Sequence, residues 1–350
     1  MNDTNGGKMT KNEKMSHEAV RPDNTAAMGR RVNIERSGLT YMDFYDRDIV
    51  SIRDLTREEI EYLLDLSEEM MPYATGEKTS RLLDGKILGN LFFEPSTRTK
   101  LSFESAAYRL GCDVIDVSEM SMTSISKGET LADTIRMVDA YCDLIVLRHP
   151  YEGAARLAAK FSINPVINAG DGAGSHPTQT LLDLFTMRQS KGSLDGLDVV
   201  LVGDLKYGRT VHSLAEALTM FGAKLTLVAP DTLQMPDEIV NHIKEKGCNP
   251  VKTDNLEDVI GKADVLYITR IQKERFPDPT EYKTVAGMYR VNNAMLREAM
   301  SDMIVMHPLP RIDEIAPEVD SSEHAKYFQQ AFNGVPVRMA LLKAILGGEL

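Results

Sequence analysis

Cysteine is scarce in this chain, which has only Cys112, Cys142 and Cys248 among its 350 residues. The number is odd, and no two of these residues have the C-x-x-C spacing of paired zinc ligands. A secreted disulfide framework and a paired-cysteine zinc site are therefore poorly supported. We interpret the three residues as reduced, mostly buried thiols of a cytoplasmic protein.

Long apolar runs and an excess of positive charge are also missing. No segment approaches the roughly 18 consecutive apolar residues that span a bilayer, so we expect no membrane association. The formal net charge is -12, which argues against nucleic acid as the main partner. The 43% of hydrophobic and 26% of charged residues are usual for a globular protein, and the length suits two domains.

Residues 1–45 lack a clear apolar period. They are polar and rich in Asn, Met and charge, which is typical of a flexible extension. No apolar segment follows their basic residues, as it would in a secretory signal. Acidic residues interrupt the pattern that a transit peptide would have, namely Asp3, Glu13, Glu18, Asp23 and Glu35. The role of this extension does not follow from its sequence.

After residue 45, short apolar runs alternate with amphipathic stretches. The apolar runs form two series, Ile87–Phe92, Val114–Val117, Leu144–Leu147 and Val166–Ala169, then Val199–Val202, Leu225–Val228, Val265–Ile268 and Met303–Met306. The helical stretches between them include Thr99–Leu110, Glu129–Tyr141, Thr210–Phe221 and Pro236–Lys246. Runs of four to six apolar residues suit buried strands of a parallel sheet. The alternation predicts an α/β protein with two doubly wound parallel-sheet domains.

The two series of strands divide the chain. We expect a first domain over 46–185, a second over 186–324, and a C-terminal helix within 325–350 that packs back on the first domain. Thr56 is a good N-cap for a leading helix that runs to about Met71, and a helix around Pro177–Gln189 would connect the domains. Ligands of open α/β sheets bind beyond the carboxyl ends of the strands, so residues directly after each strand are the functional candidates.

The turn after the first strand combines hydroxyls with an arginine in the order Glu94-Pro95-Ser96-Thr97-Arg98-Thr99-Lys100. A strand-to-helix turn offers free backbone N–H groups and the positive end of the helix dipole. The hydroxyls add donors, and Arg98 adds a planar charged fork. This pattern predicts a phosphate-binding turn without Walker glycines. An N-cap cluster with a surface arginine is the alternative.

Two further strands of the first series end in candidate residues. Arg148 directly follows Leu144–Leu147, where a surface ion pair is the alternative. The segment 170–179 is rich in glycine, but it is not G-x-G-x-x-G and no acid follows at the right distance, so we reject a dinucleotide site. It is better explained as a tight turn close to a small ligand. His176 begins a helix, where the dipole favours a neutral imidazole that could polarise a carbonyl oxygen.

The second series offers three more segments. Arg209 lies in Gly203-Asp204-Leu205-Lys206-Tyr207-Gly208-Arg209-Thr210, and Arg270 and Gln272 lie in the charged string after Val265–Ile268. The last strand leads into His307-Pro308-Leu309-Pro310-Arg311. Paired prolines fix an irregular backbone whose carbonyl oxygens can accept from an amide or an ammonium group. Exposed charge and an ordinary loop are the alternatives for these segments.

Several of these strings resemble the carbamoyltransferase family. Thirteen consecutive residues, Phe92 to Glu104, fit its carbamoyl phosphate signature. His176-Pro177-Thr178-Gln179 matches its H-P-T-Q motif, and residues 307–310 match its H-P-L-P motif. The resemblance covers about residues 46–345. It implies the carbamoyltransferase fold and transfer of a carbamoyl group from carbamoyl phosphate to an amine, without a cofactor or a metal.

The resemblance also implies roles for individual residues. Carbamoyl phosphate would contact Ser96, Thr97, Arg98, Thr99, Arg148, His176 and Gln179, and the carbonyls of Pro308 and Leu309. A serine and a lysine of a neighbouring subunit would reach the same site. Ser124 and Lys127 resemble these two, although Thr123 or Ser126 could supply the hydroxyl. The catalytic groups would be Arg98, Thr99, Arg148, His176 and Lys127.

The acceptor implied by the resemblance is L-aspartate, held by Lys127, Arg209, Arg270 and Gln272. Ornithine carbamoyltransferases typically have a cysteine in place of Pro308 and an S-M-G motif, and this sequence has neither. Two arginines suit two carboxylates and not an ornithine ammonium. The expected products are N-carbamoyl-L-aspartate and phosphate, in de novo pyrimidine biosynthesis.

The implied assembly is a homotrimer with sites shared between subunits, and separate regulatory chains are a further partner of some members. Two alternatives to this function stay open. One is a carbamoyltransferase for another amine such as ornithine. The other is a non-catalytic scaffold subunit, which should have lost one of the motifs, and we find all of them present.

Overall fold

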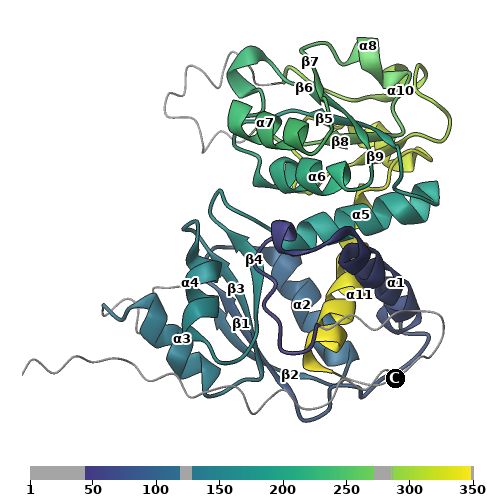
Figure 1. Ribbon diagram of the computed structural model, residues 1–350. Coiled ribbons are helices and arrows are strands. Elements are labelled where there is room, and N and C mark those ends of the chain that lie inside the picture. The colour runs from purple at the N-terminus through teal and green to yellow at the C-terminus, as the bar shows by residue number, and fades with distance from the viewer. Residues whose placement is uncertain (1–43, 119–127, 272–284, 286, 348–350) are drawn as a thin grey trace, which may run out of the picture. The chain divides into compact units, whose positions relative to one another are not determined.

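The computed structural model describes residues 44–118, 128–271, 285 and 287–347. Ser124, Lys127 and Gln272 lie outside the described residues, as does nearly all of the N-terminal extension. The described residues fall into one unit of contacts, 42–350. Figure 1 shows its two β-sheets with their helices.

The first sheet has four parallel strands in the order β2-β1-β3-β4. The strands are β1 (Ile87–Phe92), β2 (Asp113–Ser118), β3 (Leu144–His149) and β4 (Val166–Asp171). The helices between them are α2 (Thr97–Arg109), α3 (Leu131–Asp139) and α4 (Ala154–Phe161). All four strands were predicted, but the expectation that each is buried is wrong for β2. It is an edge strand, and none of its residues is fully buried.

The second sheet has five parallel strands in the order β7-β6-β5-β8-β9. The strands are β5 (Asp198–Val202), β6 (Lys224–Val228), β7 (Val251–Thr253), β8 (Val265–Ile268) and β9 (Ile304–Met306). The helices of this half include α6 (Arg209–Thr219), α7 (Asp237–Glu245), α8 (Glu257–Ile260) and α10 (Asn293–Leu296). The sequence did not predict β7, a three-residue edge strand with two exposed residues. Two parallel α/β sheets confirm the predicted fold class.

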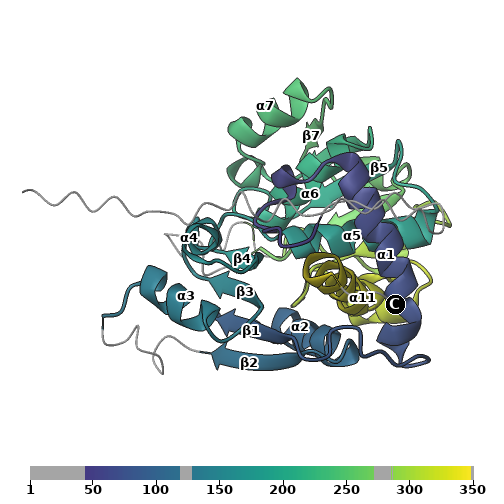
Figure 2. The ribbon, with the colours of Figure 1, turned by 60° about the horizontal axis from the view of Figure 1, so that its bottom comes forward.

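Three long helices pack beside the first sheet and between the sheets: α1 (Arg57–Thr75), α5 (Pro177–Lys191) and α11 (Tyr327–Leu346). Thr56 caps α1 as predicted, in a reciprocal capping box with Glu59. The helix α11 packs against α1, α2 and α5, and α5 also contacts α6 (Figures 1 and 2). Because α5 is covered on several sides, ten of its residues are buried.

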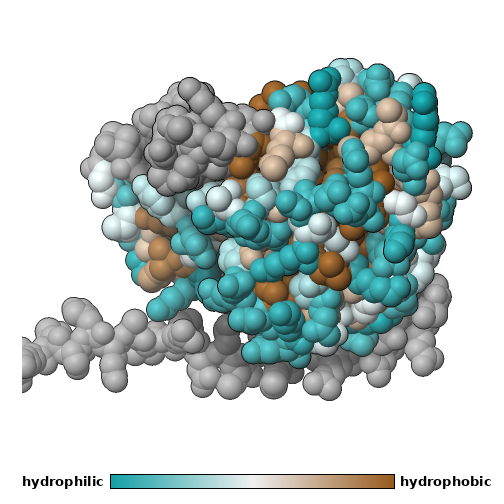
Figure 3. Space-filling model, turned by 90° about the horizontal axis from the view of Figure 1, so that it is seen from above, coloured by the Kyte–Doolittle hydropathy of each residue, from teal (hydrophilic) through white to brown (hydrophobic). Residues whose placement is uncertain are grey.

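The surface is dominated by polar side chains on the face in Figure 3, where apolar residues form small separate patches. None of the helices in the described part of the chain is long and apolar enough to cross a bilayer. Cys112, Cys142 and Cys248 are all unpaired, which confirms the prediction of free thiols.

Candidate active site

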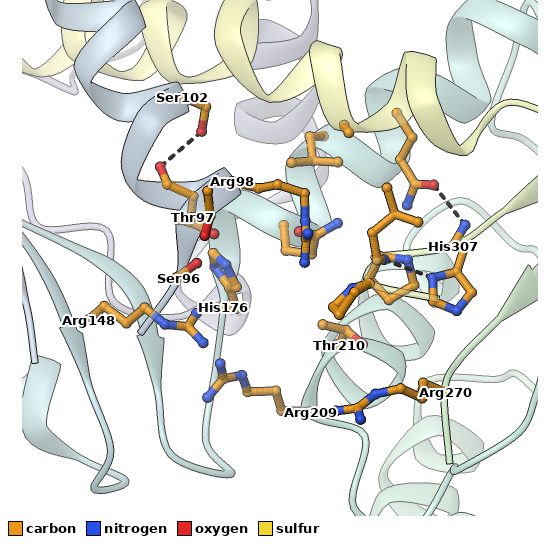
Figure 4. A pocket seen from close by; sticks show the side chains of 18 of the residues that line it. Ser96, Thr97, Arg98, Ser102, Arg148, His176, Arg209, Thr210, Arg270 and His307 are labelled. Carbon is orange, nitrogen blue, oxygen red and sulfur yellow. Dashed lines mark hydrogen bonds between the residues drawn. The ribbon is translucent and has the colours of Figure 1, made fainter. Parts of the chain in front are cut away.

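A cavity of about 490 Å³ lies where the strand ends of both sheets meet α11. Its walls come from the turn after β1, the end of β3, the starts of α5 and α6, the end of β8, the loop after β9 and α11. The lining includes Ser96, Thr97, Arg98, Thr99, Arg148, His176, Gln179, Arg209, Arg270, Pro308 and Leu309. The predicted site residues that the structure describes are therefore brought together in one cavity (Figure 4).

The start of α2 forms one wall. Ser96 is the N-cap residue in an extended conformation, and its side chain makes no capping hydrogen bond. The simple capping alternative therefore does not account for this hydroxyl. Burial lowers the pKa of the Arg98 guanidinium, which means that its charge is poorly solvated. Together with the free N–H groups of the first helical turn, this wall suits an anion such as phosphate.

Glu94 lies between two arginines, Arg148 near the end of β3 and Arg209 at the start of α6. Its Oε2 is 3.0 Å from Arg148 Nη2 and 3.6 Å from Arg209 Nη2. Burial lowers the pKa of Arg148 to about 10, and the neighbouring charge of Arg209 adds to this effect. Among the described residues that line the cavity, Glu94 is one carboxylate against five arginines. The cavity favours a ligand with several negative charges.

Gly170 explains how the two arginines come so close. Its φ is +116°, and a Cβ there would lie 2.7 Å from Arg148 Nη1 and 3.0 Å from Arg209 Nη2. Arg148 Nη1 donates to the carbonyl of Ala169 at 3.1 Å, and Arg209 Nη1 donates to the carbonyl of Gly172. The predicted tight turn therefore leaves space for two guanidinium groups, because Gly170 has no Cβ.

His176 is buried at the start of α5. Its pKa is lowered well below the usual value by burial, and further by Arg148, Arg209 and Arg338. A neutral imidazole was predicted from the helix dipole, whereas burial and the arginines are the main causes here. Thr178 Oγ1 accepts from Arg338 Nη2 at 3.2 Å and lies 3.5 Å from His176 Nδ1. Because the Thr178 hydroxyl accepts from arginine, its own proton can be donated to His176 Nδ1. This favours the tautomer of His176 that carries its proton on Nε2.

The loop after β9 is fixed by His307. The backbone N–H of Leu309 donates to His307 Nδ1 at 2.8 Å, so Nε2–H donates to Glu314 Oε1, also at 2.8 Å. Burial would raise the pKa of Glu314, but hydrogen bonds from His307 and the backbone lower it to about 2. Leu309 has a φ of 57°, an unusual conformation for leucine that this network maintains. The Pro308 and Leu309 segment therefore lines the cavity in one defined conformation.

Comparison with known proteins agrees with this geometry. The family models for the aspartate/ornithine carbamoyltransferase carbamoyl-P binding domain and Asp/Orn binding domain match residues 47–189 and 195–345. The aspartate carbamoyltransferase catalytic subunit of Methanocella arvoryzae is 56% identical over 310 residues, which are 88% of this chain and 100% of that protein. That of Archaeoglobus fulgidus is 57% identical over 300 residues, 86% and 99% of the two chains. The chain belongs to the aspartate carbamoyltransferase family.

Solved structures of this family share the fold. The catalytic subunit of M. jannaschii aspartate transcarbamoylase aligns with a TM-score of 0.81 at 49% identity, covering 86% of this chain and 98% of that one. The Trypanosoma cruzi aspartate transcarbamoylase in complex with carbamoyl phosphate and aspartate aligns with a TM-score of 0.83 at 42% identity, covering 87% and 98%.

Sequence reasoning missed the contribution of α11 to this cavity. Gln330 and Arg338 line the cavity, and Gly334 lies between them on the same helix face. A signal was available, because spacing of i, i+4 and i+8 places these three residues in one row on one face of α11. Among the described residues, no group of three or more His, Cys, Asp or Glu side chains is arranged to hold a metal ion.

Proposed function

We propose that this chain transfers the carbamoyl group of carbamoyl phosphate to the amine of L-aspartate, forming N-carbamoyl-L-aspartate and phosphate for pyrimidine biosynthesis. The observation that carries this proposal is the single cavity in which the α2 turn and Arg148 face Arg209 and Arg270. A relative 42% identical to this chain has been solved with carbamoyl phosphate and aspartate together.

The phosphate of carbamoyl phosphate is assigned to the start of α2. Ser96, Thr97 and Thr99 supply hydroxyl and backbone donors there, and Arg98 and Arg148 supply charge. Gln179 and the carbonyls of Pro308 and Leu309 receive the carbamoyl amide. All of these residues line the cavity, which supports a binding mode with the phosphate at α2 and the carbamoyl group toward the second sheet.

L-Aspartate is assigned to the other side of the cavity. Arg209, at the start of α6, and Arg270, after β8, line this side (Figure 4), and Gln272 and Lys127 complete the proposed set. Two guanidinium groups provide bidentate sites for two carboxylates. An ornithine side-chain ammonium would instead meet like charge, which disfavours the ornithine alternative.

The chemistry follows from positioning and electrostatics. The aspartate amine attacks the carbonyl carbon, and Thr99, Arg148 and neutral His176 stabilise the negative charge that develops on the carbonyl oxygen. The bond to phosphate then breaks, and the leaving phosphate accepts the amine proton. Glu94 is held between Arg148 and Arg209, so this carboxylate acts as a link between the two sides and not as the base.

The proposed assembly is a homotrimer in which Ser124 and Lys127 of a neighbouring chain enter each site, with Lys127 as a catalytic group. Separate regulatory chains are a further proposed partner, because the relatives are called catalytic subunits. We propose the cytoplasm as its location, which suits three unpaired cysteines. The proposed division of the chain remains 46–185, 186–324 and 325–350.

Two experiments test this function. Arg98→Ala should lower turnover by at least about 100-fold, the usual loss when a preorganised charge is removed; normal turnover would overturn the phosphate assignment.

Mixing Arg98→Ala chains with Lys127→Ala chains should restore activity, because about one site in three of a mixed trimer has both intact groups. Verified mixed trimers without activity would contradict the shared site. A folded protein without turnover in any assembly would favour the scaffold alternative.

A further inference from the structure

A buried carboxylate lies directly behind the cavity. Asp183, in the middle of α5, is 0% exposed. Its Oδ1 accepts from Gln179 Nε2 at 2.9 Å and from Gln330 Nε2 at 2.6 Å, and its Oδ2 accepts from the Tyr267 hydroxyl at 2.8 Å. One side chain therefore connects α5, α11 and β8. None of the proposed catalytic steps uses it.

The network fixes the orientation of Gln330. Its amide lies between Asp183 and the backbone N–H of His307, which donates to Gln330 Oε1 at 2.8 Å. The N–H of His307 can only donate, so it pairs with Oε1 of Gln330 and leaves the Nε2 donor for Asp183 Oδ1. The Gln330 amide therefore has one orientation that satisfies both neighbours. The Gln330 amide thereby holds His307, the residue directly before the Pro308 and Leu309 segment.

The same logic orients Gln179, which also lines the cavity. Asp183 Oδ1 accepts a hydrogen bond from Nε2 of this amide. The oxygen Oε1 is then the acceptor that Gln179 can offer to a ligand. A carbonyl oxygen accepts hydrogen bonds, so this wall of the cavity suits a ligand group that carries N–H donors.

Orientation of this kind has a consequence for selectivity. A carbamoyl group carries an NH₂ donor at the position where an acetyl group of nearly the same size carries a methyl. A site in which a hydrogen-bond acceptor has a fixed orientation rejects a ligand that leaves this acceptor unpaired. If the Gln179 amide could flip, it would present its NH₂ group to the ligand, and the cavity would lose its preference for a ligand with an N–H donor.

We propose that Asp183 is a positioning residue that orients the amides of Gln179 and Gln330, and thereby makes the cavity select a carbamoyl over an acetyl group. This inference rests on the proposed binding of carbamoyl phosphate in the cavity. The charged and titratable groups that face Asp183 are Arg338 on α11 and Tyr267 on β8.

The test compares two phosphates of nearly equal shape. The KM for carbamoyl phosphate is measured at saturating L-aspartate, and acetyl phosphate is measured as a competitive inhibitor. Asp183→Ala removes the acceptor, and Asp183→Leu removes it while keeping most of the volume. For either variant we expect the KM to rise about tenfold, the cost of about one lost hydrogen bond, while the inhibition constant of acetyl phosphate changes less than about twofold.

The conservative variant Asp183→Asn serves as the rescue. Its amide oxygen can still accept from both glutamines, and its NH₂ group can donate to the Tyr267 oxygen, so the ratio of the two constants should stay near that of the wild type. Asp65→Asn is the matched control for loss of charge, because Asp65 pairs with Arg188 at the far end of α5. It should leave both constants unchanged.

Three outcomes would overturn the inference. Equal weakening of both phosphates in Asp183→Leu would indicate a packing role only. The same loss in Asp183→Asn would indicate that charge matters and not the acceptor. An unchanged ratio in every variant would also contradict it. A wild-type protein that neither binds nor uses carbamoyl phosphate would instead overturn the proposed function itself, so the two failures are distinguishable.

Discussion

Gly334 and Arg338 lie one turn apart on α11, and the guanidinium of Arg338 fills the space that a side chain at position 334 would need. A Cβ on Gly334 would lie 2.1 Å from Arg338 Nη1. Arg338 is buried, its guanidinium lies 4.9 Å from the Phe103 ring centroid, and it reaches the cavity. A side chain at position 334 would displace the guanidinium, so the glycine leaves the space in which Arg338 lies.

Gly334→Ala should therefore weaken carbamoyl phosphate binding. In an ordinary helix interior this change stabilises by about 0.5–1 kcal/mol, but here the added methyl displaces Arg338. We expect the KM for carbamoyl phosphate to rise about fivefold or more, measured by initial rates. In the double variant with Arg338→Ala, the glycine substitution should add no further loss, because both act on one group. Additive losses would contradict this account.

The contact between Thr178 and His176 predicts a second effect. Thr178→Val keeps the shape of the side chain but removes the hydroxyl that favours the Nε2–H tautomer. We expect kcat to fall about tenfold, less than the roughly 100-fold loss of a whole oxyanion donor because the imidazole itself remains, with smaller changes in KM. Thr178→Ser keeps the hydroxyl and should retain most of the activity. Nitrogen NMR of the imidazole reports the tautomer directly, and an unchanged tautomer in Thr178→Val would refute the assignment.

Asp183 predicts a dependence of stability on pH. Burial raises the pKa of its carboxyl to about 7, against the hydrogen bonds from Gln330, Tyr267 and Gln179. Between about pH 4 and 7 the native state holds a proton that the unfolded state has lost, so the stability contributed by this group is present at low pH and decreases as pH rises. Burial lowers the pKa of Arg338 to about 9 and raises the pKa of Tyr267 well above its usual value, so both groups titrate above this window.

The measurement compares the wild type with Asp183→Asn by urea unfolding at several pH values. The unfolding free energy of the variant relative to the wild type should increase through this window, by at most about 1.4 kcal/mol per pH unit, and level off above it. A difference that is independent of pH would show that Asp183 ionises in the native protein as it does in the unfolded chain.

The sequence predicts which residues line this cavity best where they follow the ends of strands. Arg98, Arg148, His176 and Arg209 could be found because the carboxyl ends of parallel strands gather at one edge of a sheet. The edge position of β2 could not be read from Val114–Val117, since strand order depends on tertiary pairing that the apolar pattern does not encode.

The residues behind the cavity wall could not be predicted from the sequence, because their contacts also depend on tertiary packing. Asp183 lies in the middle of a helix, and its partners Gln330 and Tyr267 come from elements far away in the chain. Nothing local marks them as neighbours. The row of Gln330, Gly334 and Arg338 on α11 was a readable signal, but its meaning depends on the packing of α11 against α2 and α5.

Product analysis with carbamoyl phosphate and either L-aspartate or L-ornithine tests the proposed reaction and its acceptor together. We expect N-carbamoyl-L-aspartate from the first mixture and no citrulline from the second, because Arg209 and Arg270 suit a dicarboxylate. Citrulline as the only product would keep the phosphate site and contradict the acceptor assignment, and no product from either amine would contradict the proposed reaction.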